Sequence, residues 1–367
     1  MSVDTSGPDL TDPPGLSRAA LTAWCAANLP EFDSSVLPSA TLLPGGRSNL
    51  TYEVVDAAGR RWAVRRPPLG HVMPSAHDLD REFRVLSGMT RAGFPVPHPR
   101  ALCTEPSVIG SGFLVMDFVD GVVIADRVDA ERLSPEQAGV VSEVLVSGLA
   151  RLHSLDANAI GLGDFGRPQG YLRRQVRRWG EQWELSRTRS IPGIDAMASW
   201  LAEHVTTVPE DLPWSVVHGD YRLDNCILSE GTDALRAVLD WEMSTLGDPV
   251  ADLAVALVYW TQADDGLRSR VPVAEQVTSG AGFWRRADIV ERYAELTGRD
   301  LDHLGFCLVL ACYKLAVILE SLHYRSLMGQ QLGRMQELGE DMGQGVEALA
   351  MLGERLVDAP DVETLRA

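Results

Sequence analysis

Hydrophobic and polar residues alternate with a period of two in several short segments before residue 120. These segments are 40–43, 50–55, 61–66, 100–104 and 113–118. Alternation of this kind is typical of strands with one buried face, so we predict a five-stranded antiparallel sheet. Helical spacing predicts one helix at 16–29, before the first strand, and another at about 76–92, between the third and fourth strands.

After Gly121 the spacing of apolar residues becomes helical. Helices are predicted at 135–155, 171–186, 194–206, 250–261, 282–297, 301–327 and 330–356. A small β-rich lobe joined to a large helical lobe is an α+β arrangement. We therefore expect a disordered tail at 1–14, an N-terminal lobe at 15–118 and a C-terminal helical lobe at 119–367. Lys314 interrupts the apolar run 304–319, which is short for a membrane span and favours a buried helix.

Composition narrows the classes of protein to consider. The 367 residues are 45% hydrophobic, enough for a full globular core, and the net charge of −18 argues against nucleic-acid binding. The acidity could attract a cationic substrate or could simply confer solubility. The five cysteines are scattered, and the polar, acidic start is unlike a signal peptide. We expect a reduced, cytoplasmic protein with no nucleic-acid or membrane partner, whose oligomeric state the sequence leaves open.

One segment carries the candidate chemistry. It runs His218-Gly219-Asp220-Tyr221-Arg222-Leu223-Asp224-Asn225, and Asp240-Trp241-Glu242 follows it. Between these two segments, residues 226–239 are predicted to form a hairpin, which would bring Asn225 and Asp240 side by side. The amide oxygen of Asn225 and the carboxylate of Asp240 could then share one Mg²⁺. Asp220 would lie outside this pair, free to position a hydroxyl and take its proton. Phosphoryl transfer from ATP needs this set of groups.

This order of residues resembles a known superfamily. His-Gly-Asp-x-x-x-x-Asn followed by Asp-x-Glu is similar to the aminoglycoside phosphotransferase and choline kinase superfamily, which has a bilobal, protein-kinase-like fold. The continuation through Gly247-Asp248-Pro249 and Asp252-Leu253-Ala254 looks most like the branch related to kinase domains fused to acyl-CoA dehydrogenases. The resemblance extends over residues 15–355 and implies that ATP and Mg²⁺ are the cofactors.

Further residues are candidates for holding the nucleotide. Gly46 and Ser48 lie in a glycine-containing turn whose N–H groups could approach phosphate, although such a turn can also be only a turn. Arg65 shares a strand face with Ala63 and stands where kinase-like folds usually have a lysine that contacts the α- and β-phosphates. Arginine can bind phosphate bidentately. The expected partner of Arg65 is Glu82, on the predicted helix.

The resemblance implies roles for the end of the fifth strand. Met116 would line the back of the adenine pocket, with ordinary core packing as the alternative, while the Asp117 carbonyl and the Val119 N–H would pair with the adenine edge.

Supporting roles are expected closer to the motif. His218 would bond the loop backbone, Asp252 would brace the catalytic loop, Asp248 could cap a helix, and Glu242 could reach Mg²⁺ directly or through water; these last four stay hypotheses.

The acceptor is the least constrained part of the hypothesis. The helix at 171–186 carries Arg173, Arg174, Arg177 and Arg178, which could be a solvated face or could bind an anionic acceptor through Arg174 and Arg178.

We expect an ATP- and Mg²⁺-dependent O-phosphotransferase acting on a small-molecule hydroxyl, such as a hydroxyacyl compound or another anionic metabolite. An aminoglycoside kinase is one alternative. A nucleotide-binding pseudokinase acting through protein contacts is another, supported by the atypical Arg65 alone.

Overall fold

The computed structural model describes residues 11–43, 49–69, 78–272, 276–329 and 339–366. The chain divides into two compact units, each of which takes residues from two separate stretches of the sequence. The first comprises residues 1–120 and 237–242, and the second comprises residues 121–236 and 243–367. Gly46 and Ser48, the predicted phosphate contacts, lie outside the described residues.

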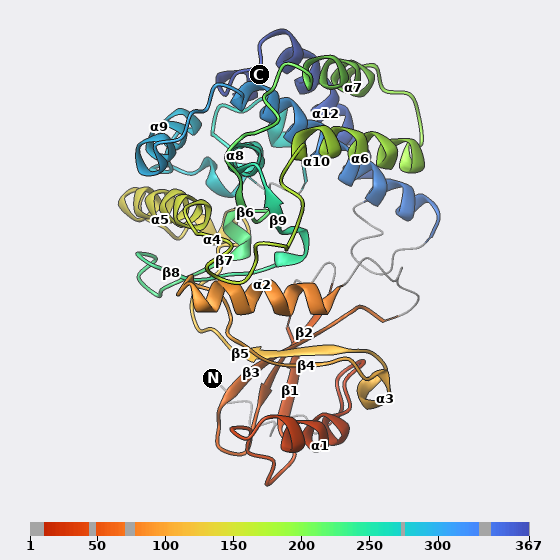
Figure 1. Cartoon of the computed structure of the whole chain (residues 1–367), viewed down its shortest axis with the longest axis vertical. Helices are drawn as coiled ribbons and strands as arrows, with labels where there is room; N and C mark the ends of the chain where they lie inside the picture. The colour runs from red at the N-terminus through yellow and green to blue at the C-terminus, as the bar shows by residue number, and fades with distance from the viewer. Residues whose placement is uncertain (1–10, 44–48, 70–77, 273–275, 330–338, 367) are drawn as a thin grey trace, which may run out of the picture. The chain divides into compact units, whose positions relative to one another are not determined.

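A five-stranded antiparallel sheet forms the centre of the first unit (Figure 1). Its strands are β1 (Ser39–Leu42), β2 (Leu50–Val55), β3 (Arg61–Arg66), β4 (Pro99–Cys103) and β5 (Phe113–Asp117), in the spatial order β1-β2-β3-β5-β4. The α-helices among the described residues of this unit are α1 (Arg18–Asn28), α2 (Leu79–Arg91), which contacts β4 and β5, and α3 (Pro106–Ile109). The predicted sheet is confirmed, and α3 is an element that the sequence pattern did not predict.

The alternating pattern explains where the core of the first unit lies. Tyr52, Val54, Trp62 and Val64 are buried on β2 and β3, and they belong to one hydrophobic cluster with Leu21 of α1. Burying large apolar side chains is the main favourable term in folding. The sheet therefore has one face held against α1.

Residues 11–14 make specific contacts, so the predicted disordered tail is wrong for this part of 1–14. The Asp12 carboxylate pairs with the buried Arg18 guanidinium at 3.0 Å. The Pro14 carbonyl accepts a hydrogen bond of 2.5 Å from the Tyr52 hydroxyl. A buried arginine needs a charged partner, and Asp12 supplies it. Residues 1–10 are not among the described residues.

Helices make up most of the second unit (Figure 1). They are α4 (Arg127–Ala130), α5 (Pro135–His153), α6 (Tyr171–Ser186), α7 (Pro192–His204), α8 (Pro249–Tyr259), α9 (Arg286–Thr297), α10 (Leu304–Leu327) and α12 (Gly339–Asp358). The central α10 packs against α6, α7, α8 and α12. The helix predicted from residue 282 begins only at Arg286, because Gly282 has a left-handed φ of +93° that a helix cannot contain.

Helix α10 is also the part of the described chain that is long and apolar enough to cross a membrane. Its 24 residues include an 18-residue window that is 72% buried within the protein. Such burial agrees with the buried helix that the sequence predicted for this segment.

Two small sheets carry the segments that hold the motif. β6 (Ser215–Val217) pairs with β9 (Thr245–Gly247), with Val217 opposite Thr245. β7 (Cys226–Leu228) and β8 (Leu235–Val238) form the predicted hairpin. The pairing of β6 with β9 was not predicted. Because the pairing is antiparallel, the point where the chain leaves β6 at His218 lies beside the start of β9 at Thr245.

Candidate active site

The loop after β6 is held by hydrogen bonds to its backbone. The N–H groups of His218 and Gly219 donate to the two carboxylate oxygens of Asp252, each at 2.7 Å. The Asp220 N–H donates to Nδ1 of His218 at 3.2 Å. These are the backbone contacts predicted for His218 and Asp252. Gly219 has a φ of +84°, and a Cβ there would lie 2.8 Å from the Met243 carbonyl oxygen, so glycine is required.

Asp220 and Asn225 are directly bonded. The Asn225 side-chain amide, at the end of the 3₁₀ turn η1 (Leu223–Asn225), donates to the Asp220 carbonyl oxygen at 2.9 Å and to its carboxylate at 3.1 Å. Both bonds use the amide nitrogen, so the amide oxygen is the atom with which Asn225 could hold Mg²⁺. The Arg222 guanidinium lies 3.3 Å from the same carboxylate, whose side chain is 19% exposed.

The electrostatic surroundings keep Asp220 ionised. Burial alone would raise the pKa of its carboxyl, but the charges of Arg222 and Lys314 and a hydrogen bond from the Tyr259 hydroxyl lower the pKa below its ordinary value. A carboxylate with a lowered pKa is fully charged at neutral pH. It can therefore accept a hydrogen bond from an incoming hydroxyl, which is the chemistry predicted for Asp220.

Lys314 is a site residue whose role the sequence analysis missed. Its ammonium group donates a hydrogen bond to the Gly219 carbonyl and lies 5.7 Å from the centre of the Trp179 ring. Lys314, Trp179, Tyr171 and Gln175 line a pocket that reaches Gly219, the residue before Asp220. The signal was present in the sequence, since Lys314 is the charge that interrupts an otherwise apolar run, but nothing indicated what it faces.

His153 is the second residue that the sequence did not reveal. Its Nε2 lies 3.1 Å from the Asp252 carboxylate and its Nδ1 lies 2.7 Å from the Tyr293 hydroxyl, all three side chains being buried. The Oδ2 atom of Asp252 is thus bonded to both the loop backbone and the His153 ring, while Oδ1 accepts from the Gly219 N–H. The chain offers no local sign of this, because His153 ends a helix that is far from the motif in sequence.

In the first unit, Arg65 is held between two carboxylates. Its Nε lies 3.3 Å from Glu82, and its Nη2 donates to Asp240 at 2.7 Å. The predicted ion pair between Arg65 and Glu82 is therefore present. Burial opposes the charge of Arg65, but Glu82, Asp240 and Glu242 outweigh it and raise the pKa of the guanidinium. An arginine fixed in this way presents a positive charge at a constant position. Its binding of a nucleotide phosphate group stays a prediction.

Asp240 has an unusual backbone. Its φ of +64° is one that residues other than glycine rarely adopt. Strain of this kind persists only where the surrounding structure holds it, and it is common at functional sites. The Asp240 carboxylate is of the oxygen type that Mg²⁺ prefers. Asp240 belongs to the first unit and Asn225 to the second, so the sharing of one ion by these residues stays a prediction, as does a part for Glu242.

The proposed adenine contacts lie on and after β5. Met116 is buried opposite Ala63 of β3, consistent with either of its two interpretations. The Asp117 carboxylate binds Arg60 at 3.1 Å and Arg100 at 2.8 Å, so this side chain is used in surface ion pairs. The backbone roles predicted for Asp117 and Val119 stay predictions.

The arginines of α6 do not form one common face for an anion. Arg173 pairs with Glu210 at 2.7 Å, and Arg177 lies 3.8 Å from Glu181. Arg174 donates to the carbonyl groups of Arg167 and Gln169, which closes the turn that leads into the helix. Arg174 is therefore engaged in structure, a correction to its predicted acceptor role. Arg178 is exposed beside Trp179, 5.5 Å from the ring centre, and stays a candidate.

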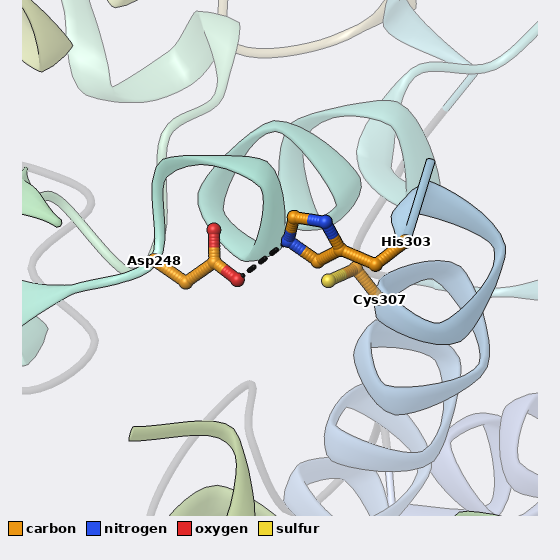
Figure 2. A group of neighbouring side chains, drawn as sticks. All are labelled: Asp248, His303 and Cys307. Atoms are coloured by element: carbon orange, nitrogen blue, oxygen red, sulfur yellow. Dashed lines mark hydrogen bonds and ion pairs between the residues drawn. The ribbon is translucent and has the colours of Figure 1, made fainter. Parts of the chain in front are cut away.

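Asp248 caps α8, as the sequence suggested, by accepting a hydrogen bond of 2.8 Å from the Val250 N–H. Its other oxygen lies 2.8 Å from Nε2 of His303, and Cys307 completes a group whose ligand-type atoms lie within 4.8 Å of one another (Figure 2). Burial and the nearby Asp248 raise the pKa of the Cys307 thiol well above its usual range. A protonated thiol and a fully engaged carboxylate are typical of a structural brace between α8 and α10.

Comparison with known families agrees with the motif. The profile described as the phosphotransferase enzyme family matches residues 39–289. Acyl-CoA dehydrogenase family member 11 of Rattus norvegicus is 33% identical over 315 residues, covering 84% of this chain and 40% of that protein. Member 10 of Mus musculus is 34% identical over 291 residues, covering 78% of this chain and 26% of that protein. The chain therefore spans well under half the length of these relatives.

Solved structures show the same fold. A Ralstonia eutropha protein assigned as an aminoglycoside phosphotransferase superposes with a TM-score of 0.76 at 31% identity, covering 93% of this chain and 98% of that one. A more distant structure, an aminoglycoside phosphotransferase in ternary complex with AMP-PNP and hygromycin B, has a TM-score of 0.58 at 14% identity, covering 90% and 98%. These likenesses and the separate β-rich and helical units confirm the expected kinase-like α+β fold.

Proposed function

The chain belongs to the phosphotransferase enzyme family, and we propose that it transfers the γ-phosphoryl group of ATP to a hydroxyl of a small-molecule acceptor in the presence of Mg²⁺. The state of Asp220 carries this proposal. Its carboxylate is oriented by Asn225 and Arg222 and is ionised because nearby cations lower its pKa. It can thus position an acceptor hydroxyl and take its proton as the phosphoryl group transfers.

The other site residues would bind the metal ion and neutralise the charge of the phosphate groups. Mg²⁺, when bound, supplies positive charge against the phosphate oxygens. Asn225 and Asp240 would hold it through an amide and a carboxylate oxygen. Arg65, kept in place by Glu82 and Asp240, would neutralise phosphate charge, since its guanidinium is always protonated. Because the transition state is loose, positioning and electrostatics contribute most of the rate.

For the acceptor, we propose a hydroxylated acyl compound or another anionic metabolite. Two observations support this choice. The pocket beside Asp220 has the Lys314 ammonium and the Trp179 ring in its wall, which suits a ligand with a negative group and an apolar part. The relatives that are a third identical are named as acyl-CoA dehydrogenase family members, although the chain corresponds to only a part of each.

An aminoglycoside acceptor is the second candidate. The Ralstonia eutropha protein with 31% identity is assigned to that activity, and the net charge of −18 would attract a polycation. The pocket beside Asp220 opposes it, because the Lys314 ammonium would repel the amino groups of such a substrate. A pseudokinase is disfavoured because Asp220, Asn225 and Asp240 are all of the residue types that catalysis needs.

A transfer assay tests the proposal directly. The protein is incubated with ATP, Mg²⁺ and panels of hydroxyacyl-CoA esters, free hydroxy acids and aminoglycosides, and phosphorylated products are identified by mass spectrometry. We expect a product with the acyl or hydroxy-acid panel that Asp220→Asn abolishes. Asp233→Asn, in the exposed hairpin turn, is the matched control and should retain activity. Products only with aminoglycosides would replace the acceptor, and no transfer or ATP turnover with any panel would favour a pseudokinase.

A further inference from the structure

An arginine in the second unit is buried without a hydrogen-bond partner for its side chain among the described residues. Arg268 begins the 3₁₀ turn η3 (Arg268–Arg270), and its side chain is 0% exposed. Its Nε, Nη1 and Nη2 atoms find no hydrogen-bond partner anywhere in the described part of the chain. A buried guanidinium normally has its five N–H donors occupied, because an unsatisfied buried charge is among the most costly features that a protein can contain.

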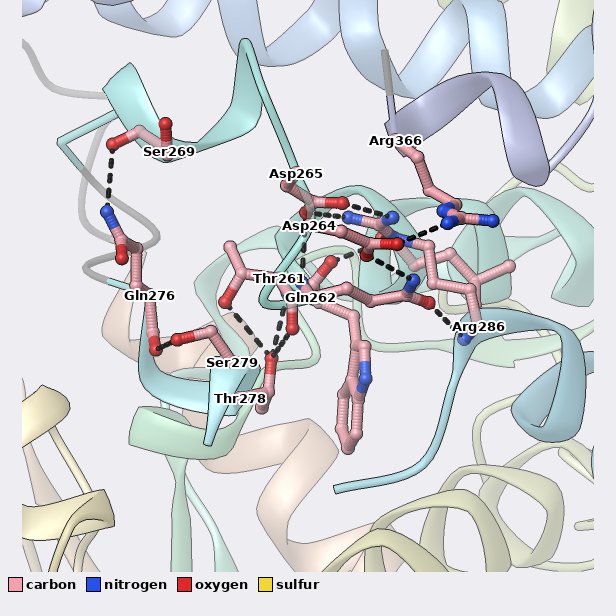
Figure 3. A network of polar contacts seen from close by, with 12 residues as sticks. Thr261, Gln262, Asp264, Asp265, Ser269, Gln276, Thr278, Ser279, Arg286 and Arg366 are labelled. Atoms are coloured by element: carbon pink, nitrogen blue, oxygen red, sulfur yellow. Dashed lines mark hydrogen bonds and ion pairs between the residues drawn. The ribbon is translucent and has the colours of Figure 1, made fainter. Parts of the chain in front are cut away.

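The carboxylate that acts on the charge of Arg268, Asp265, is already hydrogen-bonded to another arginine. Asp265 receives hydrogen bonds from both terminal nitrogens of Arg286, at 2.8 Å for Nη1, and from the Gln262 N–H at 2.9 Å (Figure 3). The side chains of Arg286 and Asp265 are each 1% exposed. Two buried arginines thus lie close to one carboxylate, so the local balance is one positive charge too many.

The charge on Arg268 cannot be removed by losing a proton. Burial and the neighbouring Arg286 lower the pKa of Arg268 to about 10, which still leaves it protonated at neutral pH. Tyr259 and Cys312 are among the groups that influence it, but both are neutral at that pH. The described chain therefore supplies no anion for Arg268, and an anion from solution would complete the site.

An open pocket lies beside the turn that Arg268 begins. The residues that directly follow it, 269–272, line an open pocket of about 270 Å³ together with Arg127, Gln276, Asp341 and Gln344. Tyr259, whose hydroxyl hydrogen bonds the Asp220 carboxylate, is also among the groups that influence the pKa of Arg268.

We propose that Arg268 is the centre of a buried binding site for an oxyanion, either a carboxylate or a phosphate group. A planar guanidinium matches both groups with two parallel N–H···O bonds. The bound anion would balance the extra charge beside the Arg286–Asp265 pair. This site is separate from the nucleotide and acceptor contacts proposed above and does not depend on the protein being a kinase.

Thermal unfolding of the whole chain tests this proposal without any substrate. The wild type, Arg268→Met and Arg286→Met are dialysed into HEPES and sodium chloride and compared at constant ionic strength. We expect Arg268→Met to have a Tm equal to or above that of the wild type, because it removes an unpaired buried charge. Arg286→Met should lower the Tm, because it removes the hydrogen bonds that Arg286 donates to Asp265 and to the carbonyl groups of Leu257 and Trp260. A lowered Tm or a failure to fold for Arg268→Met would overturn the proposal, since it would mean that the chain itself pairs Arg268.

Anion titration gives the second readout. Sodium phosphate and sodium acetate are titrated separately, with chloride adjusted to keep ionic strength fixed, and binding is measured by the rise in Tm and by calorimetry. The wild type should respond saturably to at least one anion, with affinity in Arg268→Met roughly 10- to 100-fold weaker, the scale of a charge-assisted bond. A response to acetate alone identifies a carboxylate site, and one to phosphate alone a phosphate site. No saturable response, or an equal response in Arg268→Met, would overturn the proposal.

Discussion

Arg65 and Asp240 form an ion pair of 2.7 Å although 175 positions separate them in sequence. Asp240 is also the residue with a left-handed φ of +64°, so its carboxylate is directed by a strained backbone toward the arginine. A proposed metal ligand and a proposed phosphate ligand therefore constrain each other before any nucleotide binds. This coupling predicts that altering either residue disturbs both contacts.

Asp240→Asn should weaken Mg-ATP binding and nearly abolish turnover. The change removes the negative charge from a proposed metal ligand and also weakens the bond that holds Arg65. Calorimetric titration with ATP, with and without Mg²⁺, is the measurement. Asp120→Asn, an exposed acid of the same unit, should behave like the wild type. Unchanged affinity and turnover in Asp240→Asn would remove this residue from the site.

Asp220→Asn should keep the fold and much of the ATP affinity while lowering kcat by roughly 10²-fold or more, the usual scale for loss of a general base. The motivation is that the Asp220 carboxylate is bonded to Asn225 and ionised, with the surrounding backbone held independently by Asp252. Steady-state kinetics on the identified acceptor would measure the effect. A kcat within a few-fold of the wild type would contradict the assigned role.

Elements with an uninterrupted pattern could be predicted from the sequence. Strands 50–55 and 61–66 and helix 171–186 have the expected bounds, because each keeps one periodicity from end to end. β6 and β9 could not be predicted, because each has only three residues and their pairing is a long-range contact, whereas the equally short β7 is joined to its partner by a turn. The start of α9 was placed too early because apolar residues continue through a glycine whose backbone is left-handed.

The same distinction applies to the candidate site. Asp220 and Asn225 lie within one loop, so their spacing was enough to predict that they act together. His153 is 99 positions from Asp252, and Lys314 is 95 positions from Gly219. Those contacts depend on how α5, α8 and α10 pack, which no local pattern specifies. Arg174 was misjudged for a related reason, since its bonds to the Arg167 and Gln169 carbonyls depend on the path of the preceding turn.

The pH dependence of stability should reveal the role of Asp252. Burial acts to raise the pKa of this carboxyl, but His153 and His218 outweigh it and lower the pKa. A lowered folded-state pKa stabilises the fold above the unfolded value of about 3.9, and this stabilisation is lost as the pH falls below it. Asp252→Asn should cost about 3–5 kcal/mol of unfolding free energy at pH 7, and its difference from the wild type should shrink below about pH 4.

Denaturant unfolding at pH 3, 5 and 7 measures this difference. Asp195→Asn is the matched control, because Asp195 also lies in the first turn of a helix but is exposed. A cost for Asp252→Asn that stays constant down to pH 3 would show that the charge of Asp252 is not what stabilises the loop.

Lys314→Met should change the pH dependence of kcat. The fall in kcat on the acidic side of the profile, the acid limb, should move to higher pH. Burial favours the neutral form of Asp220, and Lys314 is one of the cations that oppose this effect, so removing it should raise the pKa of the carboxyl. Lys314→Arg keeps the charge and should restore most of the wild-type profile. Arg325→Met, an exposed cation at the end of the same helix, serves as the control. An unmoved acid limb in Lys314→Met would mean that Lys314 has no electrostatic influence on Asp220.

Arg178→Glu tests whether α6 contributes to an anionic acceptor site. Arg178 is exposed beside Trp179, which also lines the pocket with Lys314. If the acceptor carries a negative group that reaches this side chain, the reversal of charge should raise its KM by an amount corresponding to about 1–3 kcal/mol, while the KM for ATP should barely change. Added salt should reproduce part of the effect in the wild type.

Arg177→Glu is the matched comparison, because Arg177 is exposed on the same helix but lies beside Glu181. It should change the acceptor KM by far less, as expected for a solvated charge. Kinetics of both variants with an acyl and an aminoglycoside acceptor at two salt concentrations separate the possibilities. An aminoglycoside should bind no worse, or better, once the positive charge is reversed. Equal effects of the two variants would assign the arginines of α6 to a solvated face and leave Lys314 as the cation of the acceptor pocket.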